Sequence, residues 1–320
     1  VAQVKCGAFH TAALLASGSL FTWGSGEQLG LGVFTGRGDR FVPTCVRKLM
    51  RHRLRSISCG PTFSAAVTHD GDVFTWGNGE FGQLGLGDRR TRYLPTLLEY
   101  FAGNDRNKRV SSVSCGGRHC VALTSTGRLY SWGSGLCEGV NSGSLGLENT
   151  SESDVPKMIH AMRSRRAVQI SCGWRSSVVL TDDHRVYAWG LIGCAAGNEL
   201  TRRNSGALVY SNVPVEVSLG RNVKPQFVDV SGSHSMSAIG VVYRPSDSVR
   251  SIADNSYVVS TRQGTKHRVV AIPESVTRLK SFKIVKKIVT DSKGSVRVKR
   301  MDSSGAWICL EGRQGGMSLK

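Results

Sequence analysis

Four stretches of the chain share one pattern of apolar and polar positions. Each contains an apolar run without alternation (AALL, SAAV, VALT and SVVL), as expected for a strand that is covered on both faces. A second run that ends in Trp-Gly follows, and between the two runs lies a two-residue turn signal: Ser17-Gly18, Asp70-Gly71 or Thr126-Gly127. Because such pairs favour tight turns, we predict a β-hairpin in each stretch. The fourth stretch departs from the pattern with Asp183-His184.

The pattern is an internal repeat. Units that start near residues 4, 57, 113 and 170 align without gaps, and a fifth, VDVSGSHSMSAIGVV, starts near residue 228 and lacks Trp-Gly. In the four complete units a Cys-Gly pair precedes the Trp, and the Cys-to-Trp separation is 17 residues each time. The recurring anchors are Gly7, Gly60, Gly116 and Gly173 together with Trp23, Trp76, Trp132 and Trp189. Their recurrence predicts structural roles, with the tryptophans filling the space between neighbouring units.

A Gly-rich turn follows each Trp-Gly, and a Pro then opens one more extended segment. The prolines are Pro43, Pro95, Pro156 and Pro214. Since Pro donates no ladder hydrogen bond, we predict that each is the first residue of an edge strand. A unit of about 55 residues then holds four short strands, which is the size of one propeller blade. We predict an all-β chain with a β-propeller of four-stranded blades, either partial or seven-bladed with degenerate blades.

The repeats end before the chain does. Residues 1–243 hold the repeat units, whereas residues 244–320 hold β-prone segments that do not continue the pattern: RQGTKHRVVAIPESV, FKIVKKIV, SVRVKR and AWICL. This basic, β-rich C-terminal segment is either a set of degenerate blades or a separate small module, and we favour the module. Residue 1 is Val and no signal-peptide pattern follows it, so we expect the sequence to be part of a longer protein.

The charge of the chain makes its surface a candidate for binding. The 320 residues carry 42 Lys+Arg against 23 Asp+Glu, a net charge of +19, and residues 241–320 alone hold 16 basic and 6 acidic residues. Basic clusters attract acidic proteins or phosphate groups, although they also form ordinary solvated surfaces. We expect propeller geometry to gather the clusters, which also include residues 47–55 and 106–109, on related rims. The candidate partner-binding residues are Arg89, Arg90, Arg92, Arg163, Arg165, Arg166, Lys283, Lys286, Lys287, Arg297, Lys299 and Arg300.

No motif indicates an enzyme. The nine Cys residues include no Cys-x-x-Cys pair, so no metal site is predicted, and their odd number favours reduced thiols inside the cell. The stretch from Gly77 to Gly82 satisfies the dinucleotide pattern GxGxxG, but it recurs as a repeat turn. No apolar run approaches the roughly 20 residues that a bilayer requires. We predict no catalytic residue, no cofactor, no small-molecule substrate and no membrane contact, and we expect a nuclear or cytoplasmic location.

At these residues the chain resembles the regulator-of-chromosome-condensation (RCC1-like) repeat family. The family unit combines small-Gly-x-x-His, Trp-Gly and Gly-Gln-Leu-Gly, and Gly82-Gln83-Leu84-Gly85 matches the last motif. We place His10, His119 and His234 at the family His position, with Phe63 and Arg175 replacing it in the second and fourth units. Because these histidines recur at one phase, we interpret them as structural residues that hydrogen-bond to local backbone.

The resemblance implies a β-propeller, usually of seven blades, that acts as a protein-interaction module. One implied function is guanine-nucleotide exchange on a small Ras-like GTPase, and the exchange residues of the family lie in loops that do not align with this chain. One alternative is a basic scaffold that associates with chromatin or nucleic acid. Another is the partner-binding region of a large multidomain protein such as a HECT ubiquitin ligase. For the nucleic-acid alternative, we expect residues 244–320 to bind DNA or acidic protein more tightly than residues 1–240.

Overall fold

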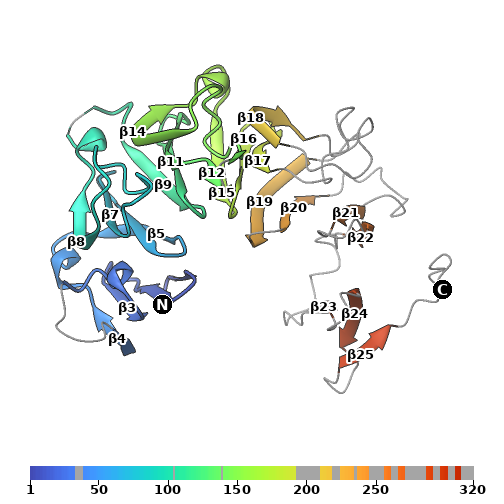
Figure 1. Cartoon of the computed structure of the whole chain (residues 1–320), viewed down its shortest axis with the longest axis horizontal. Helices are drawn as coiled ribbons and strands as arrows, with labels where there is room; N and C mark the ends of the chain where they lie inside the picture. The colour runs from blue at the N-terminus through green and yellow to red at the C-terminus, as the bar shows by residue number, and fades with distance from the viewer. Residues whose placement is uncertain are drawn as a thin grey trace. The chain divides into compact units, whose positions relative to one another are not determined.

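Each complete repeat folds into one four-stranded antiparallel sheet, which confirms the predicted all-β class and its blades (Figure 1). Blade 1 contains β1 (Gln3–Cys6), β2 (His10–Leu14), β3 (Leu20–Gly24) and β4 (Arg40–Cys45). Blade 2 contains β5 (Leu54–Cys59), β6 (Phe63–Thr68), β7 (Val73–Gly77) and β8 (Arg92–Leu97). Blade 3 contains β9 (Val110–Cys115), β10 (His119–Thr124), β11 (Leu129–Ser134) and β14 (Glu152–Met158), with the ribbon of β12 (Leu136–Cys137) and β13 (Val140–Asn141) inserted. Blade 4 contains β15 (Ala167–Cys172), β16 (Ser176–Thr181), β17 (Val186–Leu191) and β18 (Tyr210–Glu216).

The computed structural model of the protein describes residues 1–32, 39–103, 105–137, 140–191, 210–217, 224–233, 236–244, 256–260, 266–270, 286–290, 296–301 and 307–310. The chain forms two units, Val1–Ala271 and Ile272–Lys320. The first unit holds the four blades and the pairs β19 (Lys224–Ser233) with β20 (Met236–Arg244) and β21 (Ser256–Ser260) with β22 (Lys266–Val270). The second holds a sheet of β23 (Lys286–Thr290), β24 (Val296–Met301) and β25 (Trp307–Leu310). The domain boundary between residues 243 and 244 stays a prediction.

The hairpin between the second and third strands of each blade needs a left-handed residue. Gly18, Gly71 and Gly127 provide it with φ of 87°, 91° and 83°. In blade 4 His184 takes the same place with φ 60°, a conformation that side chains with a Cβ rarely adopt. Its ring Nδ1 lies 2.9 Å from the carbonyl oxygen of Pro225, at the start of β19. The unusual pair Asp183-His184 therefore forms a hairpin of the same shape, and the contact of His184 with Pro225 joins it to the next strand pair.

The predicted prolines do lie on edge strands, but their predicted position within the strand was wrong. Pro43, Pro95 and Pro156 lie inside β4, β8 and β14, not at their first residues, and Pro214 lies inside β18. The pairing of each of these strands with its neighbour shifts register beside the repeat Trp, for example between Thr22 and Gly24. An irregular edge strand tolerates a residue without an N–H at such a point.

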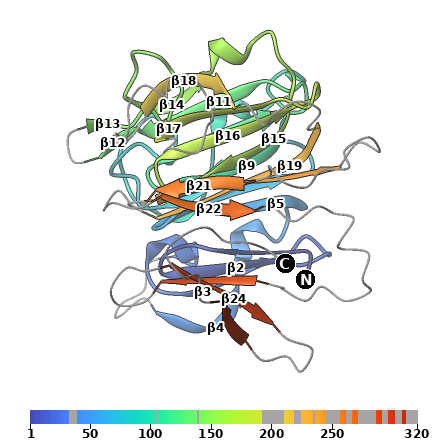
Figure 2. The same ribbon diagram turned by 90° about the vertical axis from the view of Figure 1, so that its right-hand side faces the viewer.

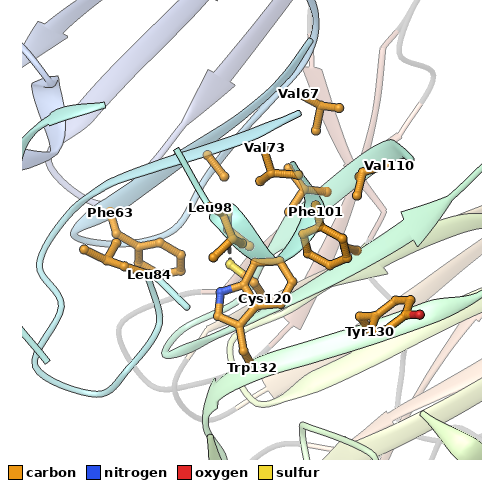
Figure 3. Close-up of a cluster of buried hydrophobic side chains, with 14 residues drawn as sticks. Phe63, Val67, Val73, Leu84, Leu98, Phe101, Val110, Cys120, Tyr130 and Trp132 are labelled. Carbon is orange, nitrogen blue, oxygen red and sulfur yellow. Dashed lines mark hydrogen bonds between the residues drawn. The ribbon is translucent and has the colours of Figure 1, made fainter. Parts of the chain in front are cut away.

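Consecutive blades pack face to face, and their first strands β5, β9 and β15 lie side by side, followed by β19 (Figure 2). The interface between blades 2 and 3 joins Phe63, Leu84, Leu98 and Phe101 with Trp132 in one apolar cluster (Figure 3). Trp76, Trp132 and Trp189 are at most 1% exposed. Burial of an indole of this size contributes several kcal/mol to stability at about 25 cal/mol per Å².

Each buried Trp also binds a backbone carbonyl of the preceding blade. The indole Nε1–H of Trp76, Trp132 and Trp189 donates to the carbonyl oxygens of Gln28, Gln83 and Ser144, at 2.8, 3.0 and 2.9 Å. These carbonyls belong to the Gly-rich turns after the third strand, and blade 1 folds this turn around the 3-10 helix η1 (Glu27–Leu29). Gly30, Gly85 and Gly146 in these turns have φ near 70°, and a Cβ on any of them would lie 2.6 to 2.8 Å from the indole. The last Gly of Gly-Gln-Leu-Gly is thus required by the Trp of the next blade.

The histidines at the family position bind a side chain of the next blade, so the expected bond to local backbone was wrong. His10 Nε2 lies 2.7 Å from Ser64 Oγ, and His119 Nε2 lies 2.8 Å from Ser177 Oγ. The hydroxyls of Ser64 and Ser177 donate to the carbonyls of Gln28 and Ser144. A hydroxyl has one proton to donate, so Nε2–H is the donor in each pair. Burial lowers the pKa of His10 and His119 to about 4, so both rings are neutral at pH 7.

Strand pairing also corrects the residue at the His position of blade 4. His10 and His119 begin β2 and β10 and pair with Gly24 and Gly133. Ser176 begins β16 and pairs with the equivalent Gly190, so Ser176, and not Arg175, takes the His place. His234 lies outside the described residues.

Candidate partner-binding surface

The direction of the strands decides on which face each basic cluster lies. In an antiparallel blade, the hairpin between strands two and three and the connection from strand four to the next blade lie at the same end. The three connections turn through the 3-10 helices η2 (Arg47–Leu49), η3 (Glu99–Phe101) and η4 (His160–Met162). A basic run follows each helix, immediately before or at the start of the next first strand. We call these residues the basic rim: Arg51, Arg53, Arg106, Lys108, Arg109, Arg163, Arg165 and Arg166.

One arginine of each run connects two blades, a role that the sequence analysis missed. Arg53, Arg109 and Arg166 each lie six residues before the repeat Cys. Their carbonyls accept hydrogen bonds from the N–H groups of His69, Ser125 and Asp182, in the hairpin of the same blade. Their side-chain stems cover Gly18, Gly71 and Gly127, in the hairpin of the preceding blade, where a Cβ would meet the arginine Cγ. The fixed six-residue spacing from the Cys was the signal in the sequence.

Aromatic rings hold two further cations of the basic rim. Lys108 Nζ lies 4.5 Å from the centroid of the Tyr100 ring, and the guanidinium carbon of Arg165 lies 4.9 Å from that of Tyr187. At these distances the ring faces attract the cations. Lys108 and Arg165 are half-buried, whereas Arg51, Arg106 and Arg163 are exposed. The rim therefore combines positioned and freely solvated positive charges.

Carboxylates lie among the cations of the rim. A cavity of about 520 Å³ is lined by Asp70, Asp72, Gly103, Asp105, Arg106 and Arg109. The Nε–H of Arg109 donates to the Asp70 carbonyl at 2.5 Å, and Asp183 contacts Arg185 at 3.2 Å and Arg165 at 3.5 Å. A hydrogen bond from Thr181, together with these two guanidinium charges, holds the pKa of Asp183 below its ordinary value. The rim is a mixed surface with an excess of positive charge.

The predicted cluster Arg89, Arg90 and Arg92 lies on the opposite face, at the end of the connection from β7 to β8 and at the first residue of β8. Arg89 forms an ion pair with Glu152 at 3.1 Å, and Arg92 forms one with Asp88 at 2.6 Å. The hydrogen bond from Arg92 lowers the pKa of Asp88. The structure thus separates this cluster from Arg163, Arg165 and Arg166, and acidic partners balance part of its charge.

The C-terminal candidates belong to the second unit. Lys286 pairs with Arg300 and Lys287 with Lys299 across β23 and β24, and Arg297 pairs with Val289. Lys283 lies outside the described residues. A partner-binding role for these residues stays a prediction.

Three further properties concern the described part of the chain. Within it, no three His, Cys, Asp or Glu side chains are grouped closely enough to hold a metal ion. Of its helices, none has the length and apolar character needed to cross a membrane. Burial raises the pKa of the Cys172 thiol to about 12 and also raises that of Cys120, so both are poor nucleophiles.

The repeat geometry agrees with a known family. The family model for the RCC1-like domain matches residues 1–239. The chain belongs to the RCC1-like domain family. Domains of this family are protein-interaction modules, and the family model covers all four blades. The predicted resemblance to the regulator-of-chromosome-condensation repeats is confirmed.

Curated relatives are about one-third identical to this RCC1-like chain over the matched residues. The ultraviolet-B receptor UVR8 of Arabidopsis thaliana is 32% identical over 239 residues, which are 73% of this chain and 51% of the receptor. The E3 ubiquitin-protein ligase HERC2 of Homo sapiens is 32% identical over 266 residues, which are 82% of this chain and 5% of the ligase. The chain therefore spans about half the length of the first relative and a small part of the second.

Solved structures share the fold. Human WBSCR16 matches with a TM-score of 0.57 and 25% identity, over 72% of this chain and 56% of that protein. Prp20p of Saccharomyces cerevisiae matches with a TM-score of 0.57 and 20% identity, over 82% of this chain and 58% of that protein. The structure of Prp20p is described together with its binding properties to Gsp1p and histones.

Proposed function

We propose that this RCC1-like domain binds an acidic surface of a protein partner through the basic rim. The observation that carries the proposal is the recurrence of the basic run at one face, in each of the three connections between the four blades. Exposed cations on consecutive blades add their fields, which raises the rate and the specificity of association with an opposite charge. The balanced Arg89 cluster on the other face lacks this property.

The carboxylates of the rim favour a protein partner over nucleic acid. Asp70, Asp72 and Asp105 lie beside Arg106 and Arg109 in one cavity. A phosphate backbone is uniformly negative and would be repelled by these side chains, whereas a protein surface can place its own cations opposite them. The excess of positive charge on the rim then selects a partner surface with an excess of carboxylates.

Two narrower forms of the proposal have support among the relatives. Guanine-nucleotide exchange on a small Ras-like GTPase, or binding to chromatin, is supported by Prp20p and its binding to Gsp1p and histones. Recognition of a partner within a large ubiquitin ligase is supported by the similarity to HERC2. Both forms use a protein partner, and the same rim variants test them.

The test compares two variants that each remove three positive charges. One carries Arg51→Ala, Arg106→Ala and Arg163→Ala on the rim, and the control carries Arg89→Ala, Arg90→Ala and Arg92→Ala on the opposite face. Binding is measured by interferometry at about 0.15 M salt, where surface charges more than about 8 Å apart are screened. The probes are nucleosome core particles, a panel of Ras-like GTPases with and without nucleotide, and duplex DNA.

We expect the rim variant to lose at least about tenfold in affinity for an acidic protein probe, and the control to lose less than about threefold. Equal losses in the two variants would contradict the assignment of the rim. Tight binding to duplex DNA alone would move the function to nucleic acid. Accelerated release of fluorescent GDP from a bound GTPase would establish nucleotide exchange as the function. No acceleration with any GTPase would exclude exchange, and the binding measurements alone would then test the basic rim.

A further inference from the structure

Blade 3 holds two thiols that face each other inside the protein. Cys115 of β9 pairs directly with Cys120 of β10, and their Sγ atoms are 3.6 Å apart. In the other three described blades the repeat Cys pairs with a hydroxyl residue instead. These pairs are Cys6 with Thr11, Cys59 with Ser64 and Cys172 with Ser177. Among the four blades that the structure describes, blade 3 alone therefore pairs two thiols across its first two strands.

The geometry of the strands allows these thiols to form a disulfide. The next pair along the ladder is hydrogen-bonded, since the Gly116 N–H donates to the His119 carbonyl at 2.7 Å. Hydrogen-bonded and non-hydrogen-bonded pairs alternate in an antiparallel sheet, so Cys115 and Cys120 form a non-hydrogen-bonded pair. The Cα atoms of such a pair are about 4.5 Å apart, within the range of roughly 4.4–6.8 Å across disulfides. Both side chains belong to the apolar cluster around Trp132 (Figure 3).

We propose that Cys115 and Cys120 are a redox switch at the interface between blades 2 and 3, which a small disulfide such as oxidised glutathione closes into a Cys115–Cys120 bond. In the reduced pair each Sγ lies 3.7 Å from a carbonyl oxygen of blade 2, that of Ser58 for Cys115 and that of Gln83 for Cys120. The bond removes both S–H donors and draws the two sulfurs together. Oxidation therefore ends both contacts with blade 2 and cross-links β9 to β10 within blade 3.

The reaction consists of two thiol–disulfide exchanges. The sulfur of Cys115 attacks one sulfur of oxidised glutathione, and one reduced glutathione leaves. The sulfur of Cys120 then attacks Cys115 in the mixed disulfide and displaces the second glutathione. The two glutathione molecules take up both electrons and both thiol protons.

Burial assigns the order of the two cysteines. Cys115 retains 7% exposure, whereas Cys120 is fully buried. This burial raises the pKa of the Cys120 thiol, which makes it a poor first nucleophile. The oxidant therefore reaches Cys115 first, when the interface between blades 2 and 3 opens locally. Cys120 lies 3.6 Å from the Cys115 sulfur and acts second.

Trypsin provides a direct assay, because Arg118 lies between the two cysteines. Cleavage after Arg109, Arg118 and Arg128 gives peptides 110–118 and 119–128, which stay together only when a disulfide links them. The full folded chain is equilibrated with oxidised glutathione at about pH 8, where thiolates form readily, and free thiols are then blocked with iodoacetamide before digestion. We expect mass spectrometry to find the two peptides linked, with the loss of two hydrogen atoms. Excess reduced glutathione should separate them again.

Blade 4 provides the matched control. The Ser177 Oγ lies 3.7 Å from the Cys172 Sγ, and cleavage after Arg175 separates the two residues into peptides 167–175 and 176–185. These peptides should stay unlinked in the unchanged protein and become linked in Ser177→Cys. Cys120→Ser gives blade 3 the pair of blade 4 and should lower the yield of linked 110–118 and 119–128 at least about tenfold.

The indole resonances show whether the bond forms in the folded interface. Oxidation should shift the Nε1–H resonance of Trp132, because the Gln83 carbonyl loses Cys120 as its second donor, and leave those of Trp76 and Trp189 in place. Three results would overturn the proposal: no linked peptides at a large excess of oxidised glutathione, glutathione on both cysteines, or linkage only after unfolding in urea. These measurements use the unchanged chain, so they decide the question even if a variant does not fold.

Discussion

The interface between blades 2 and 3 differs from the interfaces on either side of it. Between blades 1 and 2, and between blades 3 and 4, a neutral His binds a Ser of the next blade. Between blades 2 and 3, Phe63 stands in place of the His and Cys120 in place of the Ser. The Trp, the carbonyl that it binds and the Gly beside it are the same at all three interfaces.

This difference separates the required part of the interface from the variable part. The ring at the His position packs over the anchor glycine, so that a Cβ on Gly60 would collide with Phe63 and one on Gly116 with His119. The missing Cβ makes room for either ring. The His–Ser pair and the Phe–Cys pair therefore fill the same space in different interfaces. The Trp and the carbonyl that it binds are present in all three.

The largest effect should come from the shared part. Trp132→Ala empties the cluster between blades 2 and 3 and leaves the Gln83 carbonyl without its indole donor. We expect a loss of about 3–5 kcal/mol in the free energy of unfolding, measured by urea denaturation. Trp23→Ala is the matched control and should cost less than half as much, because Trp23 is half-buried. Equal costs would mean that burial between blades is not what the repeat Trp contributes.

Much of the blade could be predicted from the sequence because its signals are local. The 17-residue Cys-to-Trp spacing and the Gly turns lie within one unit, and they define strands two and three. The His–Ser contacts between blades were missed because they join residues 54 and 58 positions apart, as in His10 with Ser64. The aligned repeats did hold a signal for these contacts. The two repeat positions that meet at an interface change together, since Phe63 replaces the His and Cys120 replaces the Ser between blades 2 and 3.

The candidate surface was predicted in part. The basic clusters were found, but their division between two faces was not, because it depends on strand direction and not on composition. Counting strands would have shown it: the Arg89 cluster follows strand three, whereas the Arg163 cluster follows strand four. The ion pair of Arg89 with Glu152 joins residues 63 positions apart and has no signal within one unit.

The glycine beside the Trp should give the next largest effect. Gly85→Ala introduces a Cβ at φ 73° and 2.8 Å from the Trp132 indole. Backbone strain and overpacking together should cost about 2–4 kcal/mol in urea denaturation. Gly32→Ala is the control, because Gly32 has φ 99° and its nearest neighbour, a Leu94 side-chain carbon, would lie 3.9 Å away. The control should show backbone strain alone, so a similar cost in the two variants would contradict the close contact with the indole.

The polar interfaces should make stability depend on pH. Burial lowers the pKa of His10 and His119 to about 4, from an ordinary value of 6.5. Since the unfolded chain binds more protons between these values, stability should fall as the pH falls from 6.5 to 4, by about 1–3 kcal/mol for each His. Urea midpoints of His119→Phe should fall less steeply over this range than those of the unchanged protein. A parallel pair of curves would show that His119 does not titrate in this way.

The smallest effect should come from replacing the His–Ser pair of one interface with the Phe–Cys pair of another. His119→Phe with Ser177→Cys gives the interface between blades 3 and 4 the pair found between blades 2 and 3. Gly116 already provides the space that Gly60 provides for Phe63. The Trp189 bond to the Ser144 carbonyl is untouched. We expect the free energy of unfolding at pH 7 to change by less than about 1 kcal/mol, because the two changes keep the packing and remove both members of the polar pair.

The single change Ser177→Ala should cost more, since it leaves the buried Nε2–H of His119 without an acceptor. If the double variant were the less stable of the two, the two pairs would not be equivalent, and the interfaces would differ in more than the ring that fills them.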